Sequence, residues 1–282
     1  MAEEALLLYS GGTDSTLAAC LLAEKYDRVR LVTFRRFGLF SVENPLANVE
    51  KLRLKYGEGK ISHELLPVDR LFEKVSYDRF FHNLFRHGFF LLSTCGLCKL
   101  AMHLRAAVYC LDNGIKRVSD GANKGMDLFP DQQPGVIGLL KKMYAGLGIE
   151  YSNPVFDLEG PQDVEFADRF HLERLPGLAA VRDAEFLERK KKTAGHKLFE
   201  LGLMPSDNVK GTALDRSMQP RCFQFILFNI WLHWYYLPYA DKARYVREGD
   251  AFFGEKIERF SALLAEYREK GASSELARWV EN

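Results

Sequence analysis

The chain has 282 residues, of which 47% are hydrophobic and 27% charged, a composition typical of folded globular proteins. Its 39 lysines and arginines nearly balance 38 aspartates and glutamates, and the formal net charge of +1 excludes a global basic field for nucleic acid. Five cysteines without a visible secretion signal favour reduced thiols, metal ligation or catalysis over a disulfide scaffold, and we expect a cytoplasmic protein.

The first two-thirds of the chain alternates short apolar runs with longer helical patterns, which predicts a parallel, twisted α/β sheet flanked by helices. The expected strands are residues 5–9, 29–34, 64–68 and 117–119. The expected helices are residues 15–25, 44–55, 98–111, 136–147 and 184–201. Residues 206–221 are polar and irregular, and helical patterns follow over 222–282, including 255–270 and 274–280. We therefore expect an α/β domain over residues 1–215 and a helical region over residues 216–282.

The junction between the first predicted strand and the first predicted helix carries the string Ser10-Gly11-Gly12-Thr13-Asp14-Ser15. A glycine turn that opens a helix places backbone N–H groups and the positive end of the helix dipole together, which forms a cradle for phosphate. Ser10 and Ser15 add hydroxyl donors, and Asp14 can bind a divalent cation. A Walker A loop is excluded because no Gly-Lys-Ser/Thr closes the turn. The sequence therefore predicts a nucleotide site at the carboxyl ends of the strands.

Three of the five cysteines stand at positions where a reactive or metal-binding thiol is expected. Cys95 and Cys98 form a CxxC at the start of a predicted helix, where both sulfurs share one face and the helix dipole is expected to lower their pKa values. Cys222 begins the next helical segment, whereas Cys20 and Cys110 lie in apolar helix faces. No second CxxC and no paired-histidine motif completes a structural zinc site. The trio therefore indicates thiol redox chemistry or a three-cysteine iron–sulfur cluster with one iron left open.

Two of these motifs carry a resemblance to a known family. The loop string resembles the SGGxDS signature of the PP-loop ATP pyrophosphatases, which cleave ATP between the α and β phosphates and adenylate a carbonyl or carboxylate. Residues 93–99, with the CxxC, resemble the cysteine motif of the sulfurtransferase branch, which includes the tRNA 2-thiouridylases and the LarE-type enzymes of nickel-pincer cofactor synthesis. Residues 119–127 are similar to the LarE-type DGTNADD loop, with Gly125 and Met126 in place of the acidic residue beside the asparagine. The resemblance runs in order over residues 5–222.

The resemblance implies a Rossmann-like enzyme that uses ATP and Mg²⁺ to adenylate an acceptor oxygen and then replaces that oxygen by sulfur. It implies an ATP site made of Ser10, Gly11, Gly12, Asp14, Ser15, Thr33, Phe34, Asp120, Asn123 and Lys124. Lys124 and Lys197 are candidates for neutralising phosphate charge. The implied catalytic residues are Asp14, Cys95 and Cys222.

The chemistry of the sulfur site has two versions. In the first, Cys95, Cys98 and Cys222 hold a [4Fe-4S] cluster. In the second, Cys222 or Cys95 carries a persulfide and the other cysteine resolves the intermediate. We favour the cluster because three cysteines exceed what a disulfide cycle requires.

The partners and the function class leave alternatives open. The acceptor is a small molecule or a tRNA base, and the low net charge favours the small molecule; the sulfur donor is sulfide or a persulfide protein. Residues 223–237 are apolar but short for a membrane span, which predicts a buried helix or a homodimer interface and no membrane association. The alternative classes are an amide-forming ligase of the NAD-synthetase type with structural cysteines, and a non-catalytic nucleotide-binding module.

Overall fold

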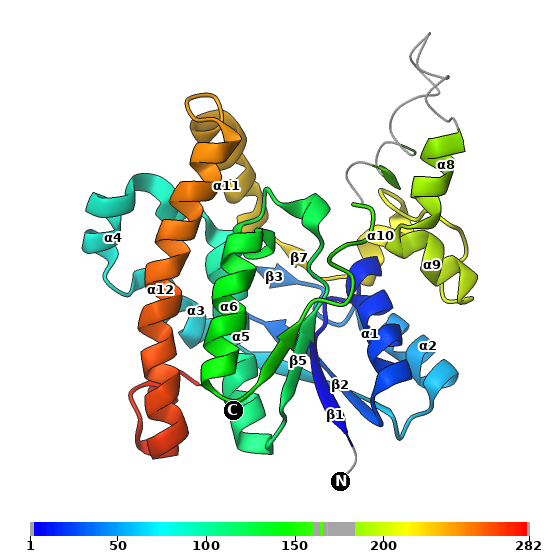
Figure 1. The fold of residues 1–282 in the computed structure, drawn as a ribbon, viewed down its shortest axis with the longest axis horizontal. Coiled ribbons are helices and arrows are strands. Elements are labelled where there is room, and N and C mark those ends of the chain that lie inside the picture. The colour runs from blue at the N-terminus through cyan, green and yellow to red at the C-terminus, as the bar shows by residue number, and fades with distance from the viewer. Residues whose placement is uncertain (1–2, 161–163, 166–167, 169–183, 281–282) are drawn as a thin grey trace.

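A parallel five-stranded sheet of order β4-β2-β1-β5-β6 forms the centre of the computed structural model, which describes residues 3–160, 164, 165, 168 and 184–280 (Figure 1). Counted along the chain, this order is 3-2-1-4-5, and it reverses between β1 and β5 as in Rossmann-like folds. The predicted fold class is confirmed. The strands are β1 (Glu4–Leu8), β2 (Arg28–Arg35), β4 (Ile61–Pro67), β5 (Arg117–Asp120) and β6 (Glu150–Ser152).

Helices cover both faces of the sheet because alternate residues of the buried strands point to opposite sides. Leu6 and Leu8 of β1 belong to a core cluster with α5, α6 and α12, whereas Ala5 and Leu7 belong to a second cluster with α1, α2 and α9. The helices are α1 (Thr13–Lys25), α2 (Leu46–Tyr56), α3 (Asp69–Tyr77), α4 (Phe80–His87), α5 (Thr94–Asn113), α6 (Pro134–Gly146), α8 (Ala184–Lys191), α9 (Ala194–Glu200), α10 (Ala213–Met218), α11 (Gln224–Ile230) and α12 (Lys242–Lys270).

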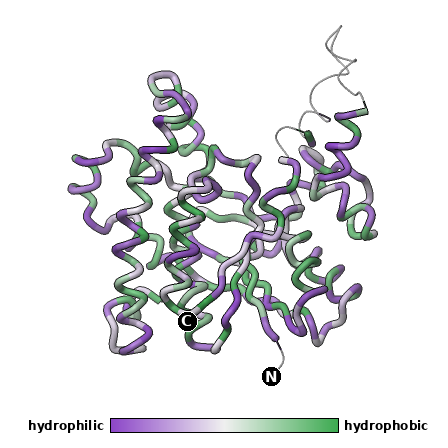
Figure 2. The backbone as a smooth tube through the Cα atoms, in the orientation of Figure 1, coloured by the Kyte–Doolittle hydropathy of each residue, from purple (hydrophilic) through white to green (hydrophobic). Residues whose placement is uncertain are grey.

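Short helical turns join several of these elements. They are the 3₁₀ turns η1 (Gly88–Leu92), η2 (Lys124–Met126), η3 (Pro130–Gln132), η7 (Gly271–Ser273) and η8 (Leu276–Trp279), and the π-helix η6 (Trp231–Tyr236). Figure 2 shows hydrophobic residues along the central strands and the hydrophilic character of α8, which carries five charged residues among its eight (Glu185, Glu188, Arg189, Lys190 and Lys191).

The structure differs from the predicted elements at several places, and α3 and α4 were not among the expected helices. The helix expected over 184–201 is two helices, because the side chain of Thr193 accepts a hydrogen bond from the backbone N–H of His196 and starts α9 anew. The strand β6 was not predicted, since three residues are too few to show a periodicity. The pair β3 (Leu39–Phe40) and β7 (Arg221–Cys222) joins segments far apart in the chain, with Leu39 opposite Cys222. Residues 221 and 222 are therefore strand and not helix.

The C-terminal helix α12 packs along α5 and α6 and runs beside α6 for much of the height of the molecule (Figure 1). Its Phe252, Phe253 and Phe260 belong to the same core cluster as Leu6 of β1. The division into two domains at residue 215 stays a prediction. In the described part of the chain, no helix taken alone has the length and hydropathy of a membrane span; helical residues 80–92 and 94–113 qualify only as a pair, which bends by 104°.

Lys256 on α12 makes the stability of the native state depend on pH in the alkaline range. Its side chain is buried and its Nζ donates hydrogen bonds to the carbonyl oxygens of Val75 (2.5 Å) and Asp78 (3.5 Å). Burial lowers the pKa of Lys256 to about 8, against an opposing effect of the Asp78 carboxylate. The unfolded chain therefore binds more protons than the native state between about pH 8 and pH 10.5, and native stability rises with pH across this window.

The size of the Lys256 pKa shift limits this rise in the free energy of unfolding to about 3 kcal/mol. Lys256→Met is expected to reduce the rise, because the variant has no group that titrates at this position. The free energy of unfolding by urea at pH 8 and at pH 10 measures it. The matched control is Lys141→Met, because Lys141 is exposed on α6. An equal rise in wild-type and Lys256→Met protein would contradict the prediction.

Candidate functional site

The loop that follows β1 is held in one conformation by contacts from three other segments. Gly11 has a φ of +80°, and a Cβ atom at this position would lie 2.3 Å from the carbonyl oxygen of Met218. The carbonyl oxygen of Gly11 accepts hydrogen bonds from Asn48 Nδ2 (2.8 Å) and Thr16 Oγ1 (3.3 Å). Only glycine combines a favourable positive φ with the absence of a Cβ atom, and both are needed at position 11. The loop is therefore a preformed turn at the point where the strand order reverses.

The turn presents the N-terminus of α1 as a polar surface. Gly12 has no side chain to cap the first turn, although its own N–H donates to Ser10 Oγ (3.4 Å). The hydroxyls of Ser10 and Ser15 lie 3.1 Å apart, and Ser15 Oγ donates to the carbonyl oxygen of Gly12 (3.1 Å). Thr13 Oγ1 is buried and has no hydrogen-bond partner within the part of the chain that is described. This arrangement suits the binding of an anion.

Charged residues that the sequence analysis missed surround Asp14. Burial raises the pKa of Asp14, while the charge of Lys210 opposes the shift and that of Asp215 adds to it. Burial also raises the pKa of Glu165 to about 7, again against the charge of Lys210. Lys210 and Asp215 are each only 8% exposed. These residues come from a segment without periodicity, and therefore no local pattern could have indicated them.

The three predicted cysteines come together on one cavity of about 330 Å³, which we call the cysteine cavity. Cys95 and Cys98 enter it from the start of α5, and Cys222 enters it through the pairing of β7 with β3. The start of α5 approaches α12 closely: a Cβ atom on Gly96 would lie 2.4 Å from the ring of Phe253. The other lining residues are Ser10, Arg36, Leu39, Thr94, Lys99, Met102, Met126, Phe129, Asp131, Gln132, Gln219 and Gln224.

Arg36, at the end of β2, joins two of the thiols and was not predicted. Its Nε donates to Cys98 Sγ (2.9 Å) and its Nη2 donates to Cys222 Sγ (3.4 Å). The guanidinium is buried, and it lies 4.3 Å from the ring centre of Phe72. Arg36 therefore fixes the positions of Cys98 and Cys222 relative to each other.

The expected lowering of the pKa values at the CxxC is wrong. Burial raises the pKa of both Cys95 and Cys98, and the charge of Arg36 opposes this shift only in part. The cost of desolvating the thiolate therefore outweighs the effect of the helix N-terminus at the partly buried Cys95 and the buried Cys98.

A second cavity of about 170 Å³ adjoins the first. We call it the nucleotide cavity because the family resemblance assigned two of its lining residues to adenine. Thr33 and Phe34, which the family resemblance assigned to adenine, both line it. Thr33 Oγ1 donates to the carbonyl oxygen of Tyr9 (2.9 Å). The two cavities share four lining residues, which are Ser10, Leu39, Lys99 and Met102. A ligand that fills the nucleotide cavity would therefore reach the edge of the cysteine cavity.

Four further residues that the family resemblance assigned to the ATP site or to phosphate lie outside both cavities. Asp120 is 0% exposed and lines neither cavity. Asn123 is buried, and its Oδ1 accepts from the backbone N–H of Gly125 (2.8 Å). Lys124 is 53% exposed and pairs with Asp157 (3.5 Å). Lys197 lies on α9 and lines neither cavity. The lysine that does line both cavities is Lys99, which the sequence analysis did not place in the ATP site.

The thiols fit a cluster better than a single ion. Among the residues that the structure describes, no three His, Cys, Asp or Glu side chains gather closely enough to hold one metal ion. A [4Fe-4S] cluster has a different requirement, because each thiolate binds a different iron. Three thiols on the wall of one cavity match that donor set. The three lining thiols therefore supply the donors that a three-cysteine cluster needs.

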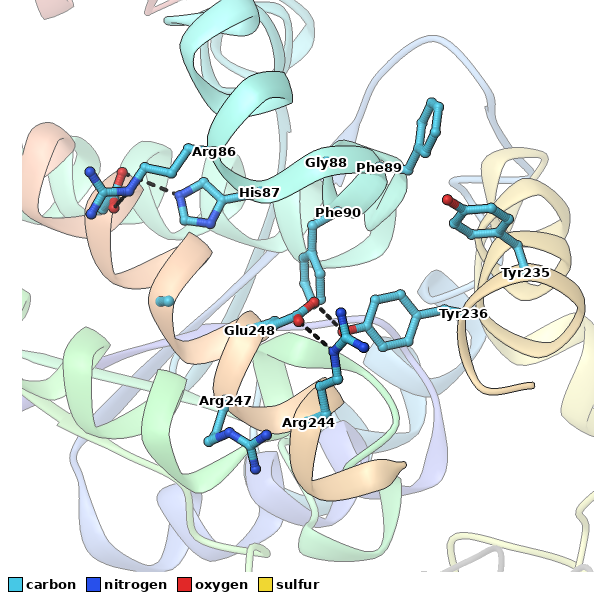
Figure 3. Close-up of a pocket in the computed structure, with 12 residues that line it drawn as sticks. Arg86, His87, Gly88, Phe89, Phe90, Tyr235, Tyr236, Arg244, Arg247 and Glu248 are labelled. Carbon is cyan, nitrogen blue, oxygen red and sulfur yellow. Dashed lines mark hydrogen bonds and ion pairs between the residues drawn. The ribbon is translucent and has the colours of Figure 1, made fainter. Parts of the chain in front are cut away.

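A further cavity of about 560 Å³ lies between η1, η6 and α12 (Figure 3). The rings of Phe89 and Tyr235 meet edge to face on its wall, with centroids 5.5 Å apart. Its charges are largely paired, since Arg244 Nε lies 2.7 Å from Glu248 and Arg86 Nε lies 2.7 Å from Glu255. No predicted site residue is among the described residues that line it.

The fold and the two adjoining cavities define a Rossmann-like α/β protein with a candidate ligand site at the reversal point of its sheet. No protein-family model matches the chain, and no curated protein sequence matches it.

Solved structures similar to the chain include the following two. A predicted subunit of tRNA methyltransferase from Methanocaldococcus jannaschii is 17% identical, with 78% of this chain and 96% of that chain covered and a TM-score of 0.39. The U34-tRNA thiolase NcsA from Methanococcus maripaludis, with its [4Fe-4S] cluster, is 13% identical, with 92% and 73% covered and a TM-score of 0.36. At these identities and TM-scores, neither likeness indicates a shared function.

Proposed function

We propose that the chain is an ATP-dependent sulfurtransferase of the PP-loop ATP pyrophosphatase type. It would adenylate an oxygen of an acceptor, release pyrophosphate, and replace the adenylated oxygen by sulfur with release of AMP. The observation that carries this proposal is the contact between the two cavities: the loop residue Ser10 lies on the wall of both, and all three cysteines line the second.

The first half-reaction uses the loop after β1. The amides of the first turn of α1 and the hydroxyls of Ser10 and Ser15 would bind phosphate oxygens, and Asp14 would place Mg²⁺. The adenine would lie against Thr33 and Phe34. An acceptor oxygen attacks the α-phosphorus, the bond between the α-phosphorus and the bridging oxygen breaks, and pyrophosphate leaves with the electron pair.

In the second half-reaction a sulfur nucleophile attacks the carbon that bears the AMP group. A C–S bond forms, the C–O bond breaks, and AMP leaves with the electron pair; sulfide or a persulfide supplies the sulfur. Cys95, Cys98 and Cys222 would hold a [4Fe-4S] cluster, and such a cluster supplies an open iron that can present sulfide. Arg36 would hold Cys98 and Cys222 in place. If a persulfide on Cys222 or Cys95 is used instead, its outer sulfur forms the C–S bond, and the other cysteine then attacks the inner sulfur and breaks the S–S bond, which releases the thiolated acceptor. The disulfide left between the two cysteines requires a dithiol reductant.

The acceptor would be a small molecule or a tRNA base.

We also propose that two copies of the chain associate through α11. Most of the side chains of α11 are exposed although apolar, namely Phe225, Ile226, Leu227 and Ile230, and residues 224–237 contain no Asp, Glu, Lys or Arg. Such an exposed apolar face is typical of a protein interface.

The test is a reaction under anaerobic conditions with ATP labelled in the α-phosphate, labelled sulfide, and either bulk tRNA or a set of small carbonyl compounds. We expect AMP to form only with the correct acceptor and label from sulfide to enter that acceptor. Equal AMP formation with ammonia, and no sulfur transfer, would instead support an amide-forming ligase. Tight ATP binding without AMP under any acceptor would support a nucleotide-binding module.

A further inference from the structure

Lys99 occupies a position that the reaction described above leaves without a role. It is the one lysine among the described residues that line the nucleotide cavity, and also the one lysine among those that line the cysteine cavity. It follows Cys98 directly in α5, and 24% of its side chain is exposed. Lys99 therefore lies on the wall that the two cavities share, with its ammonium group 3.1 Å from the buried Asp120.

Asp120 holds Lys99 in this position. Lys99 Nζ lies 3.1 Å from Asp120 Oδ2, and the same oxygen accepts a hydrogen bond from the hydroxyl of Tyr151 (3.0 Å). Asp120 Oδ1 accepts from Asn153 Nδ2 (2.7 Å) and from the backbone N–H of Ala122 (3.0 Å). Asp120 thus receives four donors and has little capacity for a ligand of its own.

The supporting groups come from three separate elements. Asp120 ends β5, Tyr151 lies in β6, and Asn153 follows β6 directly. Asp120 stands opposite Leu8 in the register, one residue before the loop after β1 begins. The buried Asp120 carboxylate therefore lies at the carboxyl end of the central strands, where it pairs with Lys99 close to the loop after β1.

An ammonium group has three donors, and Asp120 accepts from one of them. Asp131, which lines the cysteine cavity, is a second carboxylate whose charge acts on Lys99. The donors that Asp120 does not accept are those with which Lys99 would bind a ligand. Nucleotide chemistry supplies the matching acceptors, because the α-phosphate is the group on which charge changes in both half-reactions. A fixed cation next to that phosphate stabilises the charge that develops in the transition state.

We propose that Lys99 is a catalytic residue that binds the α-phosphate, first in ATP and then in the adenylated acceptor and the departing AMP, and that Asp120 is its positioning residue. The proposal rests on the proposed function for the adenylated acceptor, but the contact to AMP can be measured without it. In this arrangement α5 contributes the lysine that the loop after β1 lacks.

The test compares two ligands that differ in the phosphate alone. Binding of AMP and of adenosine is measured by calorimetry for the wild type, Lys99→Met, Lys99→Arg and Lys99→Met/Asp120→Asn. Lys116→Met is the matched control, because Lys116 is exposed at the opposite end of β5. The double variant removes both members of the ion pair and therefore leaves no buried unpaired carboxylate.

We expect Lys99→Met and the double variant to bind AMP about 10- to 100-fold more weakly, as for the loss of a hydrogen bond to a charged group, with adenosine unchanged. Lys99→Arg is expected to recover part of the AMP affinity. A loss of AMP and adenosine binding in parallel would assign Lys99 a structural role and overturn the proposal, as would unchanged AMP binding. If wild-type protein binds AMP through Lys99 but forms no AMP from ATP with any acceptor, the proposed function fails and the phosphate contact stands. If the wild type binds neither ATP nor AMP, both fail.

Discussion

Asp14→Ala is expected to reduce AMP formation from ATP by at least about 100-fold, because a divalent cation on the phosphates contributes several kcal/mol to the transition state. Asp14 lies in the first turn of α1, two residues after the Gly11-Gly12 turn. The measurement is the rate of AMP release from labelled ATP at saturating acceptor. The iron content of the protein should not change, since Asp14 is not on the cysteine cavity.

The control for this substitution is Glu24→Ala, at an exposed acidic position near the other end of α1. It should leave AMP formation within about twofold of wild type, as surface substitutions change stability little. Normal AMP formation in Asp14→Ala at low Mg²⁺ would show that this carboxylate does not place the cation.

Cys98→Ala and Cys222→Ala are expected to abolish sulfur transfer and to leave adenylation intact. If the cluster version holds, wild-type protein purified without oxygen should be brown and contain about four irons per chain, and each of these variants should be colourless. Iron analysis, absorption spectra and incorporation of labelled sulfide measure the effect. AMP formation in the same samples separates the two half-reactions.

The matched control is Cys20→Ala, which removes a buried thiol on α1 that lines neither cavity. It should keep the iron and the activity. Colourless wild-type protein that takes up no iron and still transfers sulfur would end the cluster version and leave the persulfide version. Loss of adenylation in both cysteine variants would indicate that these thiols support the structure only.

Sequence patterns predicted the features that depend on short segments. The turn after β1 and the start of α1 could be placed because their glycines and hydroxyl residues follow one another within six positions. The central strands could be placed because parallel strands buried on both faces are continuous apolar runs. The CxxC and Cys222 could be singled out because each begins a helical pattern, although Cys222 itself lies in a two-residue strand.

Contacts between distant segments could not be predicted in this way. Arg36 bonds Cys98 across 62 positions and Cys222 across 186, and the arginine has no local motif. Asp120 was assigned to the ATP site from its place at the end of a strand. In the structure Tyr151 and Asn153 donate hydrogen bonds to its carboxylate, which is fully buried.

The sequence by itself determined that a phosphate-type loop opens the first helix of an α/β sheet and that three cysteines stand apart from the core thiols. These properties follow from backbone freedom, hydroxyl placement and strand hydropathy, which act over a few residues. Only the tertiary structure decided that the cysteines share one cavity, that Arg36 joins two of them, and that Lys99 lines both adjoining cavities. Those relations depend on the order of the strands and on the β3–β7 pairing, which place residues far apart in the chain side by side.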